Sequence, residues 1–388
     1  MGNTRTPLRD SLLEAARATG DVLRRDADRS ERDGTLTAAS VEALVESGVF
    51  RAFLPTELRG HEADPLTLIE LVEAVTQHDG SAGWCTGMGG IITGIAAAML
   101  PEEGVGEVFS DPENAVFAGG FPPMGRAVVD GDGHRVSGRF RFGSGCRHAS
   151  WMVLTCIVEG AEPTPGAPIA MRSFCVPRER VEIHDNWQVA GLEGTASCDY
   201  SVENEFVPRA FSFAMGVDPA LRGSGLFALP ILSIAAVPHS GFALGMGAQT
   251  LDDVRNHATR KRLGSAAPLA ERPVFQSGFA RAATKLSAAR ALVFDGFGAL
   301  WSTYLEGGAI SLDQRAAAAA ATTNAYDVAT EAATFAYRAG GASALFRSER
   351  LQRGFRDIQA GAQHIVASEE NWERVGQVYL GVGKPMMI

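Results

Sequence analysis

The sequence lacks the glycine-rich and nucleophile motifs of several large enzyme classes. It has no GxGxxG segment after a predicted strand, no GxxxxGK[ST] loop and no GxSxG segment. The sequence therefore contains no motif for a Rossmann dinucleotide site, a P-loop or an α/β-hydrolase nucleophile elbow. Nothing in the sequence resembles an NAD(P)H site either. Redox chemistry would have to come from a borrowed cofactor or from residues that are distant in sequence.

Metal-binding and disulfide patterns are also missing. The chain has five cysteines (Cys85, Cys146, Cys156, Cys175 and Cys198), an odd number without CxxC spacing. Its eight histidines are scattered, and none of them shows HExxH or another metal-ligand spacing. We therefore expect no disulfide framework, no zinc site and no iron–sulfur cluster, and we expect buried thiols instead.

Basic runs and long hydrophobic runs are absent too. The net charge is −10, from 35 Lys and Arg against 45 Asp and Glu, which argues against nucleic acid or an anionic membrane surface as a partner. Residues 1–10 have no apolar signal-peptide core, and the stretch from Ile91 to Leu100 is too short to span a bilayer. We expect a cytoplasmic protein whose partners are small molecules and copies of itself.

The 388 residues that are present, 46% of them hydrophobic and 21% charged, can bury a large core divided into two or three domains. Helical spacing of apolar residues marks Leu8 to Ala27 and Ala38 to Glu46. Asp64 and Pro65 begin a helix that runs to about His78, and Ser81 caps an apolar helix that ends before Pro101. We assign residues 1–112 to an N-terminal all-α domain.

The helical period is lost between residues 113 and 220. Short apolar or alternating runs replace it, at Arg126 to Val129, Arg135 to Phe140, Trp151 to Val158, Ile169 to Val176 and Tyr200 to Val207. The turn Asp130-Gly131-Asp132-Gly133 between the first two runs is typical of a β-hairpin. We interpret this segment as a small β-barrel or sandwich domain.

Helix returns over residues 221–388. We predict four long helices, at Pro238 to Asn256, Pro273 to Tyr304, Leu312 to Arg338 and Arg350 to Gln377, which suggest a C-terminal four-helix bundle. The predicted fold is mainly α with a central β-domain.

Five segments in a fixed order carry a resemblance to a known superfamily. They are DGSAGW at 79–84, residues 136–151 with Ser144-Gly145 and Trp151, WQVAGLEGTASCD at 187–199, RKRLG at 260–264 with Gln276, and GGASAL at 340–345 followed by Arg353, Arg356, Asp357 and His364. Over nearly its whole length the chain resembles the acyl-CoA dehydrogenase superfamily, with its helical, β and helical-bundle domains. Within it the chain looks most like the group D flavin-dependent monooxygenases of two-component systems.

The resemblance implies a flavin site. It places Ser144 against the flavin N5 region, where a plain turn serine is the alternative. Trp151 and Trp187 would be either flavin walls or core aromatics. Gly194, Thr195 and Ser197 would hydrogen-bond the cofactor or form only a β-turn. The same resemblance puts Trp84, Met88, Phe121, His239 and His364 around the substrate, and Met88-Gly89-Gly90 and Cys198 depart from the usual pattern there.

His364 stands near the position where many dehydrogenases of this fold have a catalytic glutamate. We expect it on a helix, about two turns beyond Arg356 and on the same face. A neutral imidazole could remove a phenolic proton or help to keep a peroxide protonated. The alternative is a histidine that only packs within the bundle.

Arg260 and Gln276 resemble residues that reach across a dimer interface to the cofactor's phosphate or ribose, although a surface arginine is the other reading. Gly340 and Gly341 would let backbone approach the same part of the cofactor. The resemblance thus implies a homotetramer built as a dimer of dimers.

Three functional classes follow. The first is the oxygenase component of a two-component monooxygenase, which uses reduced FMN or FAD from a separate NAD(P)H-dependent flavin reductase, and O2, to hydroxylate a phenolic or polyketide-like substrate through a C4a-hydroperoxyflavin. N- or S-oxygenation is a variant of it. The second class is an FAD-containing acyl-CoA dehydrogenase with a carboxylate base, and the third is a flavin-binding or assembly protein without catalysis.

Overall fold

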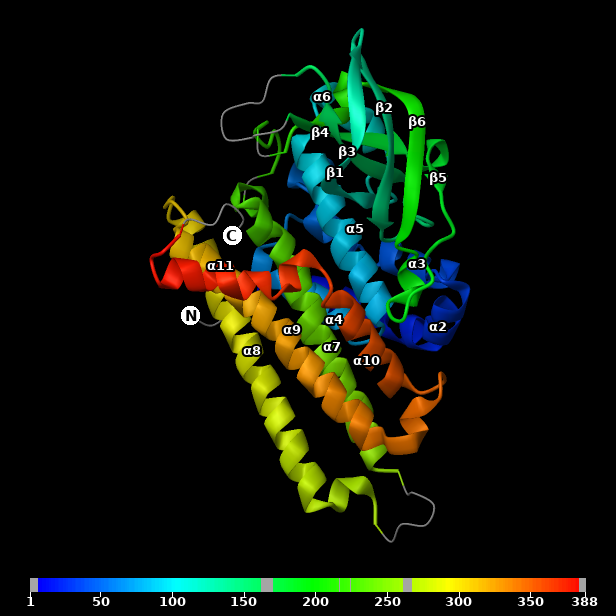
Figure 1. Ribbon diagram of the computed structural model, residues 1–388, viewed down its shortest axis with the longest axis vertical. Helices are drawn as coiled ribbons and strands as arrows, with labels where there is room; N and C mark the ends of the chain where they lie inside the picture. The colour runs from blue at the N-terminus through cyan, green and yellow to red at the C-terminus, as the bar shows by residue number, and fades with distance from the viewer. Residues whose placement is uncertain (1–5, 162–169, 216, 224, 261–266, 384–388) are drawn as a thin grey trace.

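The protein is described from a computed structural model that places residues 6–161, 170–215, 217–223, 225–260 and 267–383. A twisted β-sheet occupies one end of the molecule, and long helices extend away from it at the other end (Figure 1). Helix α5 (Gly80–Met99) runs between the two parts and packs against both strand β1 (Phe117–Asp130) and helix α7 (Ile231–Ala258). This central helix is therefore the element that can join a site on the sheet to a site on the helices.

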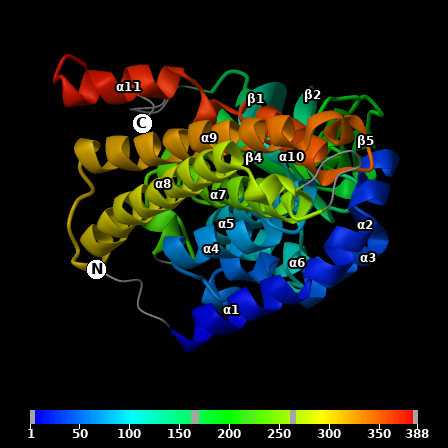
Figure 2. The same ribbon diagram turned by 90° about the horizontal axis from the view of Figure 1, so that it is seen from below.

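The helices before the sheet are α1 (Pro7–Ala18), α2 (Gly20–Asp33), α3 (Ala38–Glu46), α4 (Pro65–Thr76), α5 and α6 (Glu102–Val108). The helix predicted from Leu8 to Ala27 is in fact two helices that meet at Thr19. The start of α4 is confirmed, because the Asp64 side chain accepts from the backbone N–H groups of Leu66 and Thr67. Figure 2 shows α1 lying along the outer side of α4.

The predicted cap of α5 is wrong by two residues. Asp79, and not Ser81, is the N-cap, and its carboxylate accepts from the backbone N–H of Ala82 at 2.7 Å. Ser81 lies in the first turn of the helix. The negative charge of a carboxylate at this position also interacts favourably with the positive end of the helix dipole. Asp79 therefore stabilises the start of α5 both by its hydrogen bond and by its charge.

The strands form one seven-stranded sheet in the order β5-β6-β2-β1-β3-β4-β7. They are β1, β2 (Gly133–Gly143), β3 (Trp151–Val158), β4 (Met171–Pro177), β5 (Glu182–Ile183), β6 (Cys198–Pro208) and β7 (Ser212–Phe213). The hairpin is confirmed by the antiparallel pairing of Asp130 with Gly133. The predicted strand start at Ile169 lies outside the described residues. No pairing in the described part of the chain joins β5 to β7, so a closed barrel stays a prediction.

After the sheet come α7, α8 (Pro273–Leu305), α9 (Leu312–Gly340), α10 (Arg350–Gly361) and α11 (Glu370–Tyr379). Pro238 lies inside α7 and does not begin it as predicted. An interior proline lacks a donor for the helix ladder, and the extensive burial of α7 against α4 and α9 compensates for this loss. The helix predicted from Arg350 to Gln377 is broken between Gly361 and Glu370. The long helices α7, α8 and α9 are observed, whereas a four-helix bundle as such stays a prediction.

The apolar helices α5 and α7 are long enough to cross a membrane, so the short length of Ile91 to Leu100 does not exclude a span. In α5, 94% of the most apolar window is buried inside the protein, and in α7 the share is 78%. Their hydrophobicity is thus explained by the core of the protein. The five cysteines are free and buried, as predicted. Among the described residues, no group of three His, Cys, Asp or Glu side chains could hold a metal ion.

Close packing of α4 on α5 depends on Gly83. A Cβ atom at this position would lie 2.0 Å from Oγ1 and 2.7 Å from Cα of Thr76. We expect Gly83→Ala to lower the free energy of unfolding by about 1–3 kcal/mol, because the helices would have to separate. Denaturant titration measures this loss.

Gly106 in α6 supplies the matched control, since a Cβ there meets nothing within 4 Å. Gly106→Ala should leave stability unchanged or raise it by up to about 1 kcal/mol, because alanine favours helix. Equal effects of the two substitutions would show that the α4–α5 contact does not limit stability.

Candidate active site

A chain of buried polar groups connects the start of α5 to the sheet. Trp84 donates from Nε1 to Oγ of Ser144 at 2.9 Å. Ser144 Oγ lies 2.7 Å from Ser197 Oγ, which lies 2.7 Å from Thr195 Oγ1. Thr195 in turn donates to the carbonyl oxygen of Leu192 at 2.8 Å. The structure thus brings together four predicted site residues from three separate segments.

The backbone around Leu192 is held in an unusual conformation. Leu192 and Ala196 both have positive φ, at 55° and 46°, which side-chain-bearing residues rarely adopt. Oδ1 of Asp357 in α10 accepts the Leu192 N–H at 2.6 Å and holds this loop in place. Gly194 packs closely here, because a Cβ added to it would lie 3.1 Å from Ser81. The loop is therefore fixed from both α5 and α10.

Two histidines lie beside Trp84 on the helical side. The rings of His239, in α7, and His364 are stacked, with centroids 4.0 Å apart. The Trp84 ring meets both edge-on, at 5.2 Å from His239 and 6.0 Å from His364. His364 is not on a helix as predicted. It follows the end of α10 and caps the short 3-10 turn η9 (Ile365–Ala367), which turns its ring inward.

The hydrogen bonds of both histidines indicate where their ring protons lie. Val366 donates its backbone N–H to Nδ1 of His364 at 3.3 Å, so the proton of the neutral ring is at Nε2. The buried Tyr326 hydroxyl lies 2.8 Å from Nδ1 of His239, its one hydrogen-bond partner in the described part of the chain. The hydroxyl must donate there to be satisfied, so His239 also has its proton at Nε2.

Both rings are neutral at physiological pH. Burial lowers the pKa of His364 to about 4. Burial and, to a smaller extent, the proximity of His364 hold the pKa of His239 well below its ordinary value. The stacked pair therefore consists of two neutral imidazoles, each with an N–H donor at Nε2.

The predicted aromatic residues stand on the sheet side. Trp151 begins β3 and is stacked between Phe117, at 6.3 Å, and Phe211, at 6.0 Å. Trp187 donates from Nε1 to the carbonyl oxygen of Leu192 at 3.0 Å, which ties it to the same loop as Thr195. Met88 and Phe121 are partly buried and pack against the main core. Trp187 is thus linked to the polar chain through the Leu192 carbonyl oxygen, whereas Trp151 packs among aromatic rings.

The residues predicted to bind the cofactor's tail lie at the other end of α8 and α9. Arg260 is exposed, and Gln276 is exposed with its Nε2 donating to Ala270 O at 2.9 Å. Gly340 ends α9, and Gly341 has a φ of +61°. Residues 261–264 of the RKRLG segment lie outside the described residues.

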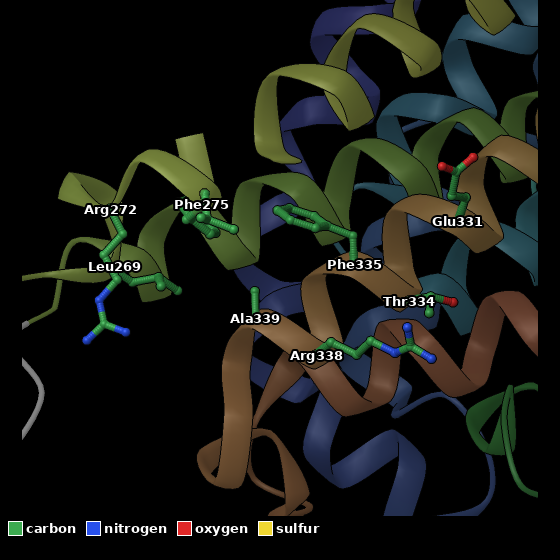
Figure 3. Close-up of a pocket in the computed structure, with 9 residues that line it drawn as sticks. Leu269, Arg272, Phe275, Glu331, Thr334, Phe335, Arg338 and Ala339 are labelled. Atoms are coloured by element: carbon green, nitrogen blue, oxygen red, sulfur yellow. The ribbon is translucent and has the colours of Figure 1, made fainter. Parts of the chain in front are cut away.

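A pocket of about 670 Å³ lies at this end, between Phe275 and Phe335 and beside Arg272 and Arg338 (Figure 3). Arg338 is twelve residues beyond Tyr326 in α9, which is about 18 Å along the helix. Within one chain these residues therefore stand well away from the histidine pair. Their predicted action across a dimer interface stays a prediction.

Comparison with known proteins assigns the site to a family. Residues 237–369 match the acyl-CoA dehydrogenase C-terminal domain family. An indole-3-acetate monooxygenase from Pseudomonas putida is 30% identical over 354 residues, which cover 90% of this chain and 89% of that protein. The chain belongs to the flavin-dependent monooxygenases of the acyl-CoA dehydrogenase fold.

Two further similarities agree with this family. An FADH2-dependent resorcinol hydroxylase, oxygenase component, from Rhizobium sp. is 28% identical over 97% of this chain and 94% of that protein. The crystal structure of 3-HSA hydroxylase from Rhodococcus sp. RHA1 superposes with a TM-score of 0.88 at 25% identity, covering 97% of this chain and 99% of that one. The resemblance stated from the five segments is confirmed.

Membership of this monooxygenase family disfavours a dehydrogenase, and the contacts of the histidine pair agree. In the described part of the chain the pair contacts Trp84, Tyr326 and the Val366 backbone, and no carboxylate contacts it. Glu370, which follows in sequence, instead pairs with Arg374 at 2.8 Å. A carboxylate that could take an α-proton is thus not found beside these rings.

Tyr326 is a site residue that the sequence did not reveal, because one tyrosine in the alanine-rich α9 carries no motif. Tyr326→Phe keeps the buried ring but removes the hydroxyl that fixes His239. We expect turnover to fall about tenfold while stability falls by only about 1 kcal/mol, the usual value of one hydrogen bond. Steady-state kinetics and thermal unfolding of the same preparation measure both effects.

Thr322→Val is the matched control for this variant. Thr322 makes a comparable 2.8 Å hydroxyl contact between α9 and α7, to Ser240, without touching His239. It should lower stability to a similar degree and leave turnover near the wild-type value. Equal turnover in the two variants would remove Tyr326 from the active site.

Asp357 gives the site loop a pH dependence. Burial raises the pKa of Asp357 to about 7, against the effect of the Leu192 N–H and with a contribution from Asp79. An unfolded aspartate titrates near pH 4, so the folded protein retains an additional proton between about pH 4 and 7. The stability due to this proton is complete below pH 4 and is lost as the pH rises through 7.

Asp357→Asn should remove this loss, since the amide oxygen can still accept from Leu192. The unfolding free energy of the variant minus that of the wild type should rise from pH 5 to pH 7 and be constant above pH 8. Denaturant titrations at pH 5, 6, 7, 8 and 9 test this, and parallel curves would contradict it. No role for Asp357 could be predicted from the sequence, because its partner Leu192 is 165 residues away.

Proposed function

We propose that the protein is the oxygenase component of a two-component monooxygenase, which uses reduced flavin from a separate reductase and O2 to hydroxylate a small aromatic substrate. The observation that carries the proposal is the contact of the Trp84–Ser144–Ser197 chain with the stacked histidines. The hydroxyl groups that could bind the flavin edge therefore lie next to the histidines that could bind the substrate. The names of the relatives, which specify an oxygenase component and aromatic compounds, support it.

The residues present fit a flavin. Ser144, Thr195 and Ser197 offer hydroxyl groups in a buried setting. These groups can hydrogen-bond the polar edge of an isoalloxazine without introducing a fixed charge. Reduced flavin, when bound, supplies the electrons that activate O2. Because a relative's name specifies FADH2, that flavin is tested first, with reduced FMN beside it.

His364 is proposed to act as a hydrogen-bond donor from Nε2 to an oxygen of the substrate. A general base at this atom would need the ring proton on Nδ1, which would then face the N–H of Val366. In that arrangement the Nδ1–H group of His364 and the N–H group of Val366 would both be donors facing each other, without an acceptor. The base role predicted from the sequence is therefore less favoured than the donor role. A donor at Nε2 stabilises the negative charge that a phenolic oxygen gains as its ring reacts.

The tail of the cofactor is proposed to contact a second chain, through Arg260, Gln276, Gly340 and Gly341 in a homotetramer. The exposure of Arg260, Gln276 and Gly341, and the distance of this end of α9 from the histidine pair within one chain, support this arrangement, whereas Gly340 is buried. Light scattering of the purified protein tests the tetramer directly.

The experiment that tests the function is anaerobic mixing of the protein with FADH2 or FMNH2, followed by O2 in a stopped-flow spectrometer. Binding at this site should slow flavin reoxidation and give a transient absorbance that differs from both reduced and oxidised flavin. Reoxidation at the rate of free flavin with stoichiometric H2O2 would argue against an oxygenase. Reduction of bound FAD by an acyl-CoA would place the protein among the dehydrogenases.

A further inference from the structure

A small cavity lies about one helical turn before His239 in α7 and is lined in part by Val366, in the turn that follows His364. Its volume is about 40 Å³, and Ser233, Ala236, Arg315, Val366, Asn371 and Arg374 contribute to its lining. Ala236 precedes His239 by three residues in α7, which is about 4.5 Å along the helix. Val366 is the residue that hydrogen-bonds His364. The cavity is thus a direct neighbour of the proposed substrate position.

Arg315 gives this cavity a positive charge without an acidic partner. Its Nε is buried and has no hydrogen-bond partner, and no described acidic side chain forms a salt bridge with it. Arg374, by contrast, bonds Glu370 at 2.8 Å and Asn371 at 3.2 Å. A half-buried guanidinium that lacks an acceptor is costly, so the cavity is suited to an anion that would pair with it.

The wall of the cavity is held in place by its own hydrogen bonds. Asn371 donates to the carbonyl oxygens of Ile365 and Val366, at 3.0 and 2.8 Å. These bonds fix the turn that follows His364 and contributes Val366 to the cavity wall. An anion bound to Arg315 would therefore lie in a constant position relative to the imidazole.

The size of the cavity decides how much of a ligand can enter. A water molecule takes up ~30 Å³ of liquid, so about 40 Å³ accepts a carboxylate group but not an aromatic ring. The ring of such a ligand has to lie outside, on the side of Ala236 and Val366, which are three and two residues from His239 and His364.

We propose that this cavity binds the carboxylate of an aromatic acid substrate, with Arg315 as its charge partner and the ring beside the histidine pair. The proposal rests on the oxygenase function above and names its substrate class as arylacetate-like acids. The neighbouring rings Trp84, His239, His364 and Tyr326 are neutral, so none of them could balance such a charge. The carboxylate also gives the ring a fixed distance from His364.

The test compares acids with uncharged analogues of the same shape. Dissociation constants of indole-3-acetate and indole-3-acetamide, and of phenylacetate and phenylacetamide, are measured by calorimetry on the wild type and Arg315→Met. We expect at least one acid to bind the wild type more tightly than its amide. Arg315→Met should weaken that acid about ten- to a hundredfold, the usual effect of a lost charge-assisted hydrogen bond, and leave the amide unchanged.

Arg281→Met, an exposed arginine in α8, is the control for the loss of one positive charge, and Arg315→Lys should keep part of the acid affinity. Equal binding of every acid and its amide by the wild type would overturn the proposal. So would an equal loss of acid and amide in Arg315→Met. A change in oligomeric mass with an unchanged ratio of acid to amide affinity would assign Arg315 to a subunit contact instead. Because these measurements use no flavin, they fail independently of the oxygenase function.

Discussion

Replacing His364 by Ala is expected to lower product formation about a hundredfold while the affinity for reduced flavin stays nearly unchanged. The loss follows because the substrate oxygen would no longer have a donor at Nε2, and groups that handle protons in the transition state typically contribute this much. His364 does not belong to the chain that links Trp84 to Ser144, so the proposed flavin contacts remain. Product is quantified under steady-state supply of reduced flavin, and flavin affinity by equilibrium dialysis.

Two further variants separate the role of His364 from a structural effect. His364→Gln retains an N–H group of similar reach, so it should recover about tenfold of the activity that Ala loses. A general base could not be replaced in this way, and Gln would then be as inactive as Ala. His184→Ala, at the edge of the sheet beside Ser201, is the control and should turn over normally. Wild-type turnover in His364→Ala would remove this histidine from the reaction.

Arg353→Met is expected to lower the free energy of unfolding by about 3–5 kcal/mol. The Arg353 side chain is buried, and its guanidinium contacts Glu31 at 2.6 Å and also Asp28. Without it, the half-buried Glu31 keeps Arg356 as its one cation among the described residues. Loss of one partner from such a cluster leaves a charge that is only partly compensated, which is why the cost exceeds that of a surface pair.

Thermal and denaturant unfolding measure this loss. Arg29→Met in α2 is the control, since its contact with Asp33 is exposed and should be worth less than about 1 kcal/mol. Replacing Arg353 and Glu31 together, by Met and Leu, should recover part of the stability, because the carboxylate that has lost one of its two cations is then gone. A double variant as unstable as the sum of both single variants would show that packing, and not charge, stabilises this cluster.

The fold could be predicted from the sequence because its signals are local. Asp64 and Pro65 fixed the start of α4, and the Asp-Gly turn fixed the hairpin of β1 and β2. Helix ends inside apolar stretches could not be read in the same way. At Thr19 one predicted helix is two, and Pro238 lies inside a helix that it was predicted to begin. At both positions burial against neighbouring helices, and not local preference, determined the course of the helix.

Trp84, Ser144, Thr195 and Ser197 could be predicted as neighbours because the five family segments contain them, and the structure brings them together, while their roles stay predictions. The remaining groups depend on long-range contacts. The break after Gly361 changed the position of His364 from a helix face to a turn. Tyr326, Asp357 and Arg315 carry no local pattern, since each derives its role from a partner or a cavity supplied by other elements.

The ion cluster around Glu31 also sets an order for folding. It joins side chains 325 positions apart in the chain, and α10 supplies both of its arginines. Synthesis delivers the N-terminal segments first, and contacts of such separation form late. Until α10 has left the ribosome, Glu31 lacks its cations and Leu192 lacks the carboxylate of Asp357. The sheet can pair early, whereas the loop that presents Thr195 and Ser197 takes its final form only after α10 has been synthesised.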